Sequence, residues 1–245
     1  MKTRLLLFCT ILIACTNVIF AQQFQPAGEK WITKWWGLDL VINTGGFDAS
    51  AKHDWISEGT GGKVTDTSAS TLSGLRKLRD IKTVKLPNNG GELKWNIVTI
   101  NPNDGNNMST SHGLVDQTNI EWYGIIVIKS PNIRETTMHP AHDDYAHIWL
   151  NGTKVYNNPN WTGGVQIVTN PTKVTLNKGE NVLLFRCGES GGSDYINLHF
   201  EATDNDLKIL PTTDGKFFQL IRSLSGEPVE SAGKLAKTWG DIKQR

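Results

Sequence analysis

Hydrophobic periodicity is clearest at residues 145–150, where Ala, Ile and Leu alternate with Tyr, His and Trp. A period of two with apolar or aromatic residues on both parities is typical of a strand inside a β-sandwich. The run stops at Asn151-Gly152, and both residue types tolerate the positive φ that a two-residue hairpin turn requires. The sequence therefore predicts a strand, a tight turn and a return strand through Val155.

The same pattern predicts strands along most of the chain. Residues 122–128 are almost continuously apolar, so we expect a central strand buried on both faces. In residues 182–187, Leu183, Phe185 and Cys187 share one parity, which predicts that Arg186 points the other way and that Cys187 is a buried small apolar residue. The other predicted strands are residues 30–42, 83–86, 93–100, 165–168, 173–176 and 195–200, with a hairpin between the second and third of these.

Few segments favour helix. Residues 47–73 are polar and broken by glycines, which predicts mostly loop, while leucines three apart in residues 72–79 indicate a helical turn. Apolar residues also recur at helical spacing in residues 234–243, where a short amphipathic helix is predicted. The expected fold is all-β: an antiparallel β-sandwich of jelly-roll type over residues 30–203, followed by a C-terminal extension, residues 204–245, with that short helical tail.

The N-terminus predicts export. Positively charged first residues precede an apolar run to Phe20 and then Ala21, so residues 1–21 are predicted to be a signal peptide cleaved after Ala21. The alternative is a bacterial lipobox at residues 12–15, which would leave Cys15 lipidated at the mature N-terminus. Both readings place the protein outside the cytoplasm, secreted or held at the outer membrane or cell surface as a lipoprotein.

Composition narrows the class of function. The formal net charge is +1, which argues against an electrostatic footprint for nucleic acid. Two of the three cysteines lie within the predicted signal, so after cleavage at Ala21 only Cys187 remains and the fold must rest on its own core. Most of the nine tryptophans are expected to pack in that core, because aromatic residues supply much of the buried area in such folds.

Four motifs together resemble the sugar-binding jelly rolls known as galactose-binding-domain-like modules. They are Trp-Ile-Thr-Lys-Trp-Trp-Gly at 31–37, Asp-Asp-Tyr-Ala-His-Ile-Trp-Leu-Asn-Gly-Thr-Lys-Val at 143–155, Leu-Asn-Lys-Gly-Glu-Asn-Val-Leu-Leu at 176–184, and Ile-Asn-Leu-His-Phe at 196–200. The resemblance covers roughly residues 30–202 and implies a β-sandwich. Similar modules accompany the catalytic barrels of β-galactosidase and β-glucuronidase relatives and occur in many secreted bacterial proteins.

The pair Asp143-Asp144, ahead of a strand that ends in Asn-Gly, is also similar to the adhesin lectins of the protective-antigen type. In that family paired aspartates hold a calcium ion that bridges to sugar hydroxyls, and the resemblance implies the same role for Asp143 and Asp144. Calcium takes several hard oxygen ligands, which adjacent carboxylates and loop carbonyls supply. The alternative is that both aspartates are turn residues, one capping loop amides and the other solvated.

Tyr145, Asn151 and Trp161 are further candidates for ligand contact at the same rim. Trp161 lies in a polar loop, residues 157–164, and an indole without a packing role can stack on a sugar ring. The alternative is that this indole folds back over the sandwich as a lid.

Two other segments partly match a zinc site and a hydrolase nucleophile, but each lacks a feature that the chemistry requires. The segment 139–142 supplies two histidines, but zinc requires three or four converging ligands. Gly-Glu-Ser-Gly-Gly at 188–192 matches a hydrolase nucleophile elbow, which a helix should follow, whereas residues 194–200 alternate as a strand. We therefore expect a glycine-rich hairpin loop at 188–192 and no enzyme.

The predicted function is an exported, non-catalytic module that binds carbohydrate or a cell-surface glycan, with calcium as the candidate cofactor. Its candidate ligand-binding residues are Asp143, Asp144, Tyr145, Asn151 and Trp161. The alternatives are a structural or adhesive cell-surface module that binds protein partners through the C-terminal tail, and a small glycoside or ester hydrolase.

Overall fold

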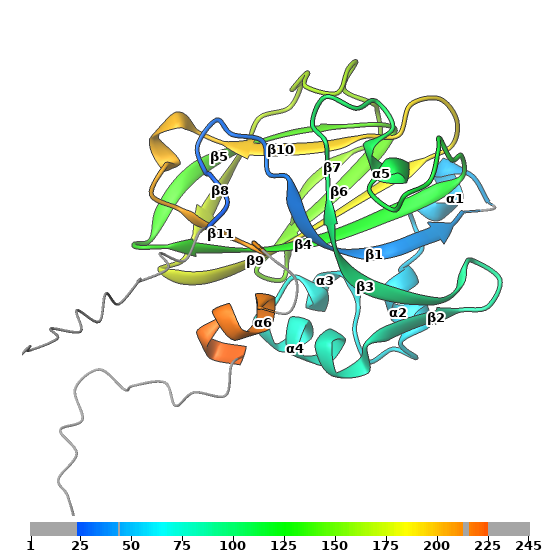
Figure 1. Ribbon diagram of the computed structural model, residues 1–245, viewed down its shortest axis with the longest axis horizontal. Helices are drawn as coiled ribbons and strands as arrows, with labels where there is room; N and C mark the ends of the chain where they lie inside the picture. The colour runs from blue at the N-terminus through cyan, green and yellow to red at the C-terminus, as the bar shows by residue number, and fades with distance from the viewer. Residues whose placement is uncertain (1–23, 44, 213–215, 225–245) are drawn as a thin grey trace, which may run out of the picture.

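Two antiparallel β-sheets lie face to face in the computed structural model, which describes residues 24–43, 45–212 and 216–224 (Figure 1). The larger sheet has the order β2-β3-β1-β4-β9-β6-β7, with β11 also paired to β4, and the smaller sheet has the order β10-β5-β8. The strands are β1 (Lys34–Ile42), β2 (Thr83–Leu86), β3 (Gly91–Thr99), β4 (Ile120–Ser130), β5 (Arg134–His142), β6 (Tyr145–Leu150), β7 (Thr153–Asn158), β8 (Thr172–Leu176), β9 (Gly179–Glu189), β10 (Ile196–Phe200) and β11 (Lys208–Leu210). The predicted all-β antiparallel sandwich is confirmed.

The larger sheet is covered on both faces. One face packs against the smaller sheet around a core that includes Trp35, Trp122 and Phe185. The other face packs against short helices, and Figure 1 shows α2 (Trp55–Gly59), α3 (Asp66–Ala69), α4 (Leu72–Ile81) and α6 (Phe217–Leu220) on the side away from β5, β8 and β10. Helix α1 (Phe47–Ser50) contacts β9 of the same sheet, and α5 (Asn107–Thr110) lies in the loop before β4.

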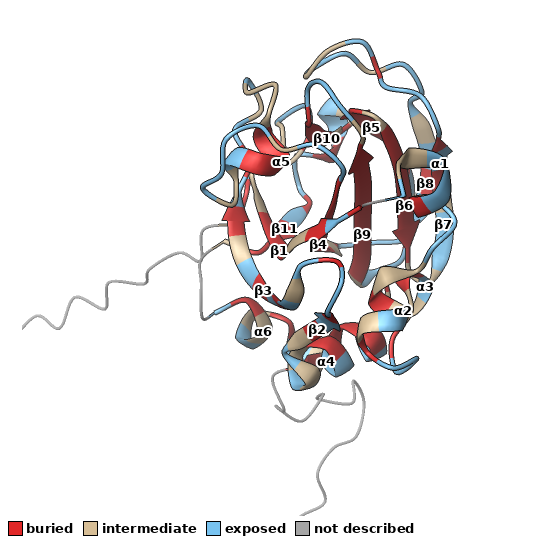
Figure 2. Cartoon of the chain, turned by 90° about the vertical axis from the view of Figure 1, so that its right-hand side faces the viewer, coloured by how far each residue is buried: buried red, intermediate tan, exposed pale blue. Residues whose placement is uncertain are grey.

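The central strands follow from the sequence. Strands β4 and β9 pair from Ile120 opposite Glu189 to Ser130 opposite Gly179, and both are buried along most of their length (Figure 2). The predicted turn at Asn151 and Gly152 is confirmed, with φ values of 52° and 85°. Trp161 is the only exposed tryptophan among the described residues, which confirms the packing role expected for most of the indoles.

The loop prediction for residues 47–73 is wrong in part, because this segment holds α1, α2 and α3. Each helix has only four or five residues, too short for a hydrophobic period to register. Side-chain caps stabilise the start of two of these helices. In α2, Asp54 accepts a hydrogen bond from the Ser57 amide, and in α3, Thr65 accepts one from the Ser68 amide. The helical turn predicted at 72–79 is confirmed within α4.

Two strand predictions also need correction. Residues 165–168 form a turn, in which the Ile167 amide donates to the Gly164 carbonyl oxygen, and not a strand. Strand β5 was not predicted, because its apolar residues are interrupted by Pro140 and flanked by histidines and threonines. It is nevertheless the middle strand of the smaller sheet.

The first part of the segment assigned to a C-terminal extension contributes to the sandwich. Strand β11 pairs with β4, and Phe217, Ile221 and Leu224 are buried against the helix-covered face. The predicted signal at 1–21 and the tail helix at 234–243 lie outside the described residues. Among the helices of the described residues, none has the length and apolar character to cross a bilayer.

A buried guanidinium joins the helices to the sheet. Arg186 on β9 is about 1% exposed and pairs with Glu121 of β4 and Asp66 of α3, each at 3.0 Å. It also donates to the backbone oxygens of Ser50 and His53, next to α1. The predicted orientation of Arg186, away from the Leu183, Phe185 and Cys187 face, is confirmed.

We expect Arg186→Leu to lower the free energy of unfolding by about 3–5 kcal/mol, because it leaves two buried carboxylates without their cation. Urea denaturation followed by tryptophan fluorescence measures this change. Lys85→Ala, at an exposed position of β2, is the control and should change stability by less than about 0.5 kcal/mol. An unchanged midpoint in Arg186→Leu would contradict this account of the network.

Candidate functional site

The chain crosses between the two sheets twice at one end of the sandwich. The turn from β5 to β6 carries Asp143 and Asp144, and the connection from β9 to β10 follows Glu189, the last residue of β9. The glycine-rich hairpin loop predicted at 188–192 is therefore wrong in part: Gly188 and Glu189 end a strand, and the loop after them joins different sheets and is not a hairpin. No helix follows it, so the nucleophile-elbow pattern lacks its structural context.

Backbone hydrogen bonds tie the two crossings together. The Asp143 amide donates to the Tyr195 carbonyl oxygen at 3.0 Å, and the Asp144 amide donates to that of Gly188 at 2.8 Å. In return the Ser190 amide donates to Asp144 Oδ2 at 3.1 Å. The peptide bond between Asp143 and Asp144 is cis. The two acidic segments are thus held by the strands behind them.

A close contact explains the glycine before Glu189. Gly188 pairs with Tyr145 across β9 and β6, and the Tyr145 ring lies over it. A Cβ atom at residue 188 would stand 2.2 Å from Cε1 of that ring. Only glycine lets the two strands come this close just before the acidic loop.

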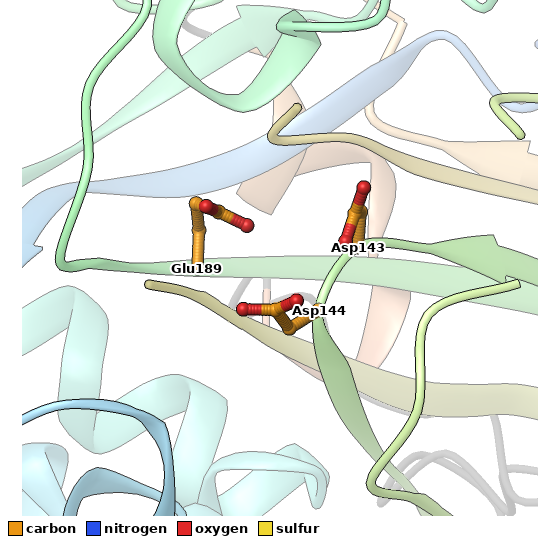
Figure 3. Close-up of side chains that lie close together, drawn as sticks. All are labelled: Asp143, Asp144 and Glu189. Carbon is orange, nitrogen blue, oxygen red and sulfur yellow. The ribbon is translucent and has the colours of Figure 1, made fainter. Parts of the chain in front are cut away.

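Three carboxylates converge at this end of the sandwich. Asp143, Asp144 and Glu189 each offer an oxygen atom, and these atoms lie within 4.8 Å of one another (Figure 3). Glu189 is fully buried, and although the Gly191 amide approaches it, neither carboxylate oxygen completes a hydrogen bond of normal geometry. Asp143 is about 9% exposed and Asp144 is half-buried. The cluster is therefore open to solvent on the Asp144 side.

Crowding and burial favour protonation of the cluster when no cation is bound. Burial, and then the neighbouring carboxylates of Asp144 and Asp143, raise the pKa of Glu189 to about 8. Burial and the Asp144 carboxylate raise the pKa of Asp143 well above its ordinary range. Asp194 adds negative charge to both. A set of hard oxygen atoms that repel one another is the chemistry of a cation site, and calcium accepts such a carboxylate-rich set.

Ser190, which follows Glu189 in the sequence, has a buried hydroxyl that completes no hydrogen bond of normal geometry within the described residues. The Tyr195 hydroxyl is also buried and lacks such a bond, although the Thr162 side chain and the Gly164 backbone approach it. Buried polar atoms are normally satisfied. Ser190 Oγ is therefore a further unsatisfied oxygen atom in the segment next to Glu189.

The structure brings Trp161 to the same end. The Thr162 amide donates to the His142 carbonyl oxygen at 3.0 Å, and the His142 amide donates to the Thr162 hydroxyl at 3.0 Å. His142 immediately precedes Asp143, so the loop carrying Trp161 is fixed beside the acidic turn. The indole is about 58% exposed. It is not folded back over the sandwich, and its face is available for contact.

Tyr145 and Asn151 lie elsewhere. Tyr145 is about 1% exposed, and its hydroxyl donates to Glu121 beneath the helices. Asn151 lies at the far end of the six-residue strand β6, about 20 Å from Asp144. Its side chain bonds to Asn181 and to the Val182 amide and so supports the hairpin.

The two histidines of segment 139–142 do not converge. His142 is buried against the Tyr156 hydroxyl at 2.9 Å, and burial lowers its pKa to about 4. His139 stacks on His199 at 4.5 Å between ring centroids, on the outer face of the smaller sheet. The two histidines lie on opposite faces of β5, so they cannot bind the same zinc ion.

Sequence reasoning missed Glu189. The signal was present, because this residue continues the parity of Leu183, Phe185 and Cys187 and therefore points toward the space between the sheets. A carboxylate on a core-facing parity at the end of a strand has no structural reason to be there. Its nearness to Asp143 depends on the sheet crossings, which no local pattern reveals.

The chain shows only weak similarity to known proteins. No protein-family profile matches the chain, and no curated protein matches it. Among solved structures, an anti-sigma factor domain-containing protein from Clostridium clariflavum is 15% identical with a TM-score of 0.31, covering 40% of this chain and 33% of that one. A family 35 carbohydrate binding module from Clostridium thermocellum is 16% identical with a TM-score of 0.25, covering 38% of this chain and 72% of that one. The PA14 domain of the MpAFP antifreeze protein is 12% identical with a TM-score of 0.34, covering 78% of this chain and 100% of that one. These values do not assign the chain to a family.

The raised pKa of Glu189 predicts how stability depends on pH in the presence of a chelator. The pKa of Glu189 is about 8 in the folded chain against an ordinary value of 4.5, so between these values the folded state binds the extra proton. That contribution to stability is lost as pH rises toward 8, and the melting temperature should fall from pH 6.5 to 8.5.

Glu189→Gln is the matched control for this pH effect. It removes the Glu189 carboxyl and should make the fall smaller, leaving the part that the raised pKa of Asp143 contributes. Burial lowers the pKa values of His142 and His147 to about 4, so both are neutral in the folded chain over this range, and their titration in the unfolded chain is common to the two proteins and cancels in the comparison. Thermal denaturation by circular dichroism measures both proteins. Identical pH profiles would show that Glu189 does not carry the raised pKa.

Proposed function

We propose that this protein is an exported, non-catalytic module that binds glycans through a cation held by Asp143, Asp144 and Glu189. The observation that carries the proposal is Glu189, fully buried with two oxygen atoms that lack a normal hydrogen bond, beside two further carboxylates. A buried carboxylate in this position is unfavourable unless a cation compensates it. The cluster is therefore better explained as a ligand set than as a turn.

Calcium is the cation whose chemistry fits best. It takes six to eight oxygen ligands in irregular geometry, whereas magnesium needs a near-octahedral set and keeps its water. The three carboxylates, together with carbonyl oxygens of the same loops, would supply the protein ligands. When bound, calcium supplies a positive centre to which two neighbouring sugar hydroxyls can bind. Asp144 is only partly buried, so these hydroxyls would approach the ion from its side of the cluster.

Trp161 is proposed as the second contact. A sugar ring bound beside Asp144 presents an apolar C–H face, and an exposed indole anchored next to Asp143 can stack on it. This arrangement separates the roles, because the carboxylates would hold the cation and the indole would hold the ring. Tyr145 and Asn151 are left out of the proposed site because their side chains are engaged elsewhere.

Export remains part of the proposal and rests on residues 1–21, where the sequence has the pattern of a secretion signal. An extracellular module without a disulfide among its described residues needs a core of its own, and the two cores of the sandwich meet that need.

The deciding experiment measures calcium and glycan binding on the same protein. Calorimetric titration of chelator-treated protein should show calcium binding, and Asp144→Asn should weaken it about tenfold or more because a charged ligand is lost. An immobilised glycan collection probed with calcium and with EGTA should show binding only with calcium.

Trp161→Ala should weaken glycan binding roughly three- to tenfold, the contribution of one aromatic contact, and leave calcium affinity unchanged. Glu135→Gln, at an exposed position of β5, is the control and should change neither affinity. Absence of calcium binding, or glycan binding that EGTA does not affect, would reject the proposal.

The Thr162 anchor gives a second test. Thr162→Val removes the hydroxyl that bonds to the His142 backbone, so the Trp161 loop should be less well placed and glycan affinity should fall roughly two- to fivefold, the effect of one or two lost hydrogen bonds. Calcium affinity should stay within twofold. Thr162→Ser keeps the hydroxyl and should behave like the wild type; equal losses in both variants would show that the hydroxyl is not the anchor.

A further inference from the structure

The proposed site is more negative than a pair of aspartates would be. Glu189 adds a third carboxylate to Asp143 and Asp144 within 4.8 Å. Asp194, whose carboxylate accepts from the Ser109 side chain and amide, acts electrostatically on both Asp143 and Glu189. Asp116 lies close enough to act on Asp194 in turn.

Within the described part of the chain, no cation offsets this charge at the cluster. The charged groups that act most strongly on Asp143 and Glu189 are all carboxylates. His142, next to Asp143 in sequence, is buried with its ring nitrogen atoms engaged by the Tyr156 hydroxyl at 2.9 Å and the Asp144 carbonyl oxygen at 3.1 Å. Arg186 is already paired with Glu121 and Asp66 behind the sheet.

A bound divalent cation would not neutralise the site. Three carboxylates carry three negative charges and a calcium ion carries two positive ones, so one negative charge remains, and Asp194 adds to it. A ligand that reaches the cation therefore enters a negative field. By contrast, two carboxylates alone would balance the ion.

We infer that Glu189 sets the ligand preference of this site: it favours neutral or amine-bearing polyols over carboxylated, sulfated and phosphorylated glycans. The inference rests on the proposed function, because it concerns what binds at the same cation. Glu189 is then a specificity-determining residue as well as a ligand.

The size of the effect follows from Coulomb's law. One unit charge about 5 Å from another, in surroundings close to the dielectric constant of water, changes affinity roughly three- to tenfold. An anionic sugar should therefore bind at least that much more weakly than its neutral counterpart. An amine in the same position should bind more tightly by a similar factor.

The first test uses the wild-type protein with calcium on a glycan collection that contains neutral, amine-bearing and anionic members. Calcium-dependent binding that is roughly threefold or more weaker for the anionic members than for their neutral counterparts supports the inference. Calcium-dependent binding of uronic acid, sialic acid or sulfated members that is as strong as that of their neutral counterparts overturns it and leaves the proposed function standing. No calcium-dependent binding to any member rejects the proposed function, and the inference with it.

The second test changes the charge alone. Glu189→Gln keeps the side-chain volume and one oxygen atom, so at saturating calcium the ratio of anionic to neutral affinity should rise roughly three- to tenfold for paired ligands. Glu135→Gln, on the outer face of the smaller sheet, should leave the ratio unchanged.

A third measurement needs no substitution and covers the case in which Glu189→Gln no longer holds calcium. Replacing calcium with terbium, a trivalent ion with the same preference for oxygen, neutralises all three carboxylates in the wild type. Terbium luminescence reports occupancy, and the anionic to neutral ratio should again rise. A ratio that stays constant with terbium would overturn the inference, whatever the affinity for the ion.

Discussion

Arg186 holds its guanidinium between the larger sheet and the helices, where water does not reach it. A charge withdrawn from water must be matched by acceptors at fixed positions, and here they come from three directions: Glu121 on β4, Asp66 on α3, and backbone oxygens beside α1. A slip of β9 by one residue would turn Arg186 into the apolar core and break every one of these contacts. The network therefore specifies both the register of the central strands and the place of the helices.

That register also determines the rim. With Arg186 toward the helices, Cys187 faces the core, Gly188 lies under the Tyr145 ring, and Glu189 points into the mouth of the space between the sheets. The turn from β5 crosses at the same mouth and brings Asp143 there. The candidate site is thus a consequence of how the strands are paired, and its geometry is supported by strands and not by loop conformation alone.

The sequence predicted what period-two patterning and turn chemistry control. The strand before Asn151, the central strand around Trp122 and the parity of Arg186 all follow from local rules. The pair Asp143-Asp144 was also recognisable in the sequence as a candidate for ligand binding. The helices between residues 47 and 69 were not predicted because a helix of four or five residues is stabilised by packing and, in α2 and α3, by a side-chain cap, and it is too short to show a hydrophobic period. Glu189 escaped for another reason: its partners come from a crossing distant in sequence, and tertiary proximity has no local signature.

A structural role alone does not account for three crowded carboxylates. Burial and the neighbouring carboxylates raise the pKa values of Asp143 and Glu189, so their ionised forms raise the free energy of the unligated fold. An amide or an apolar side chain would serve a plain turn better. A cation that binds only the folded chain reverses this effect, because it stabilises the fold by an amount that grows with the logarithm of its concentration. The burial and repulsion of the carboxylates would then both destabilise the free protein and give rise to its affinity for the ion. In the proposed function, the same excess charge that makes Glu189 unfavourable alone would continue to act after the ion binds, so one residue would govern both occupancy and the choice of ligand.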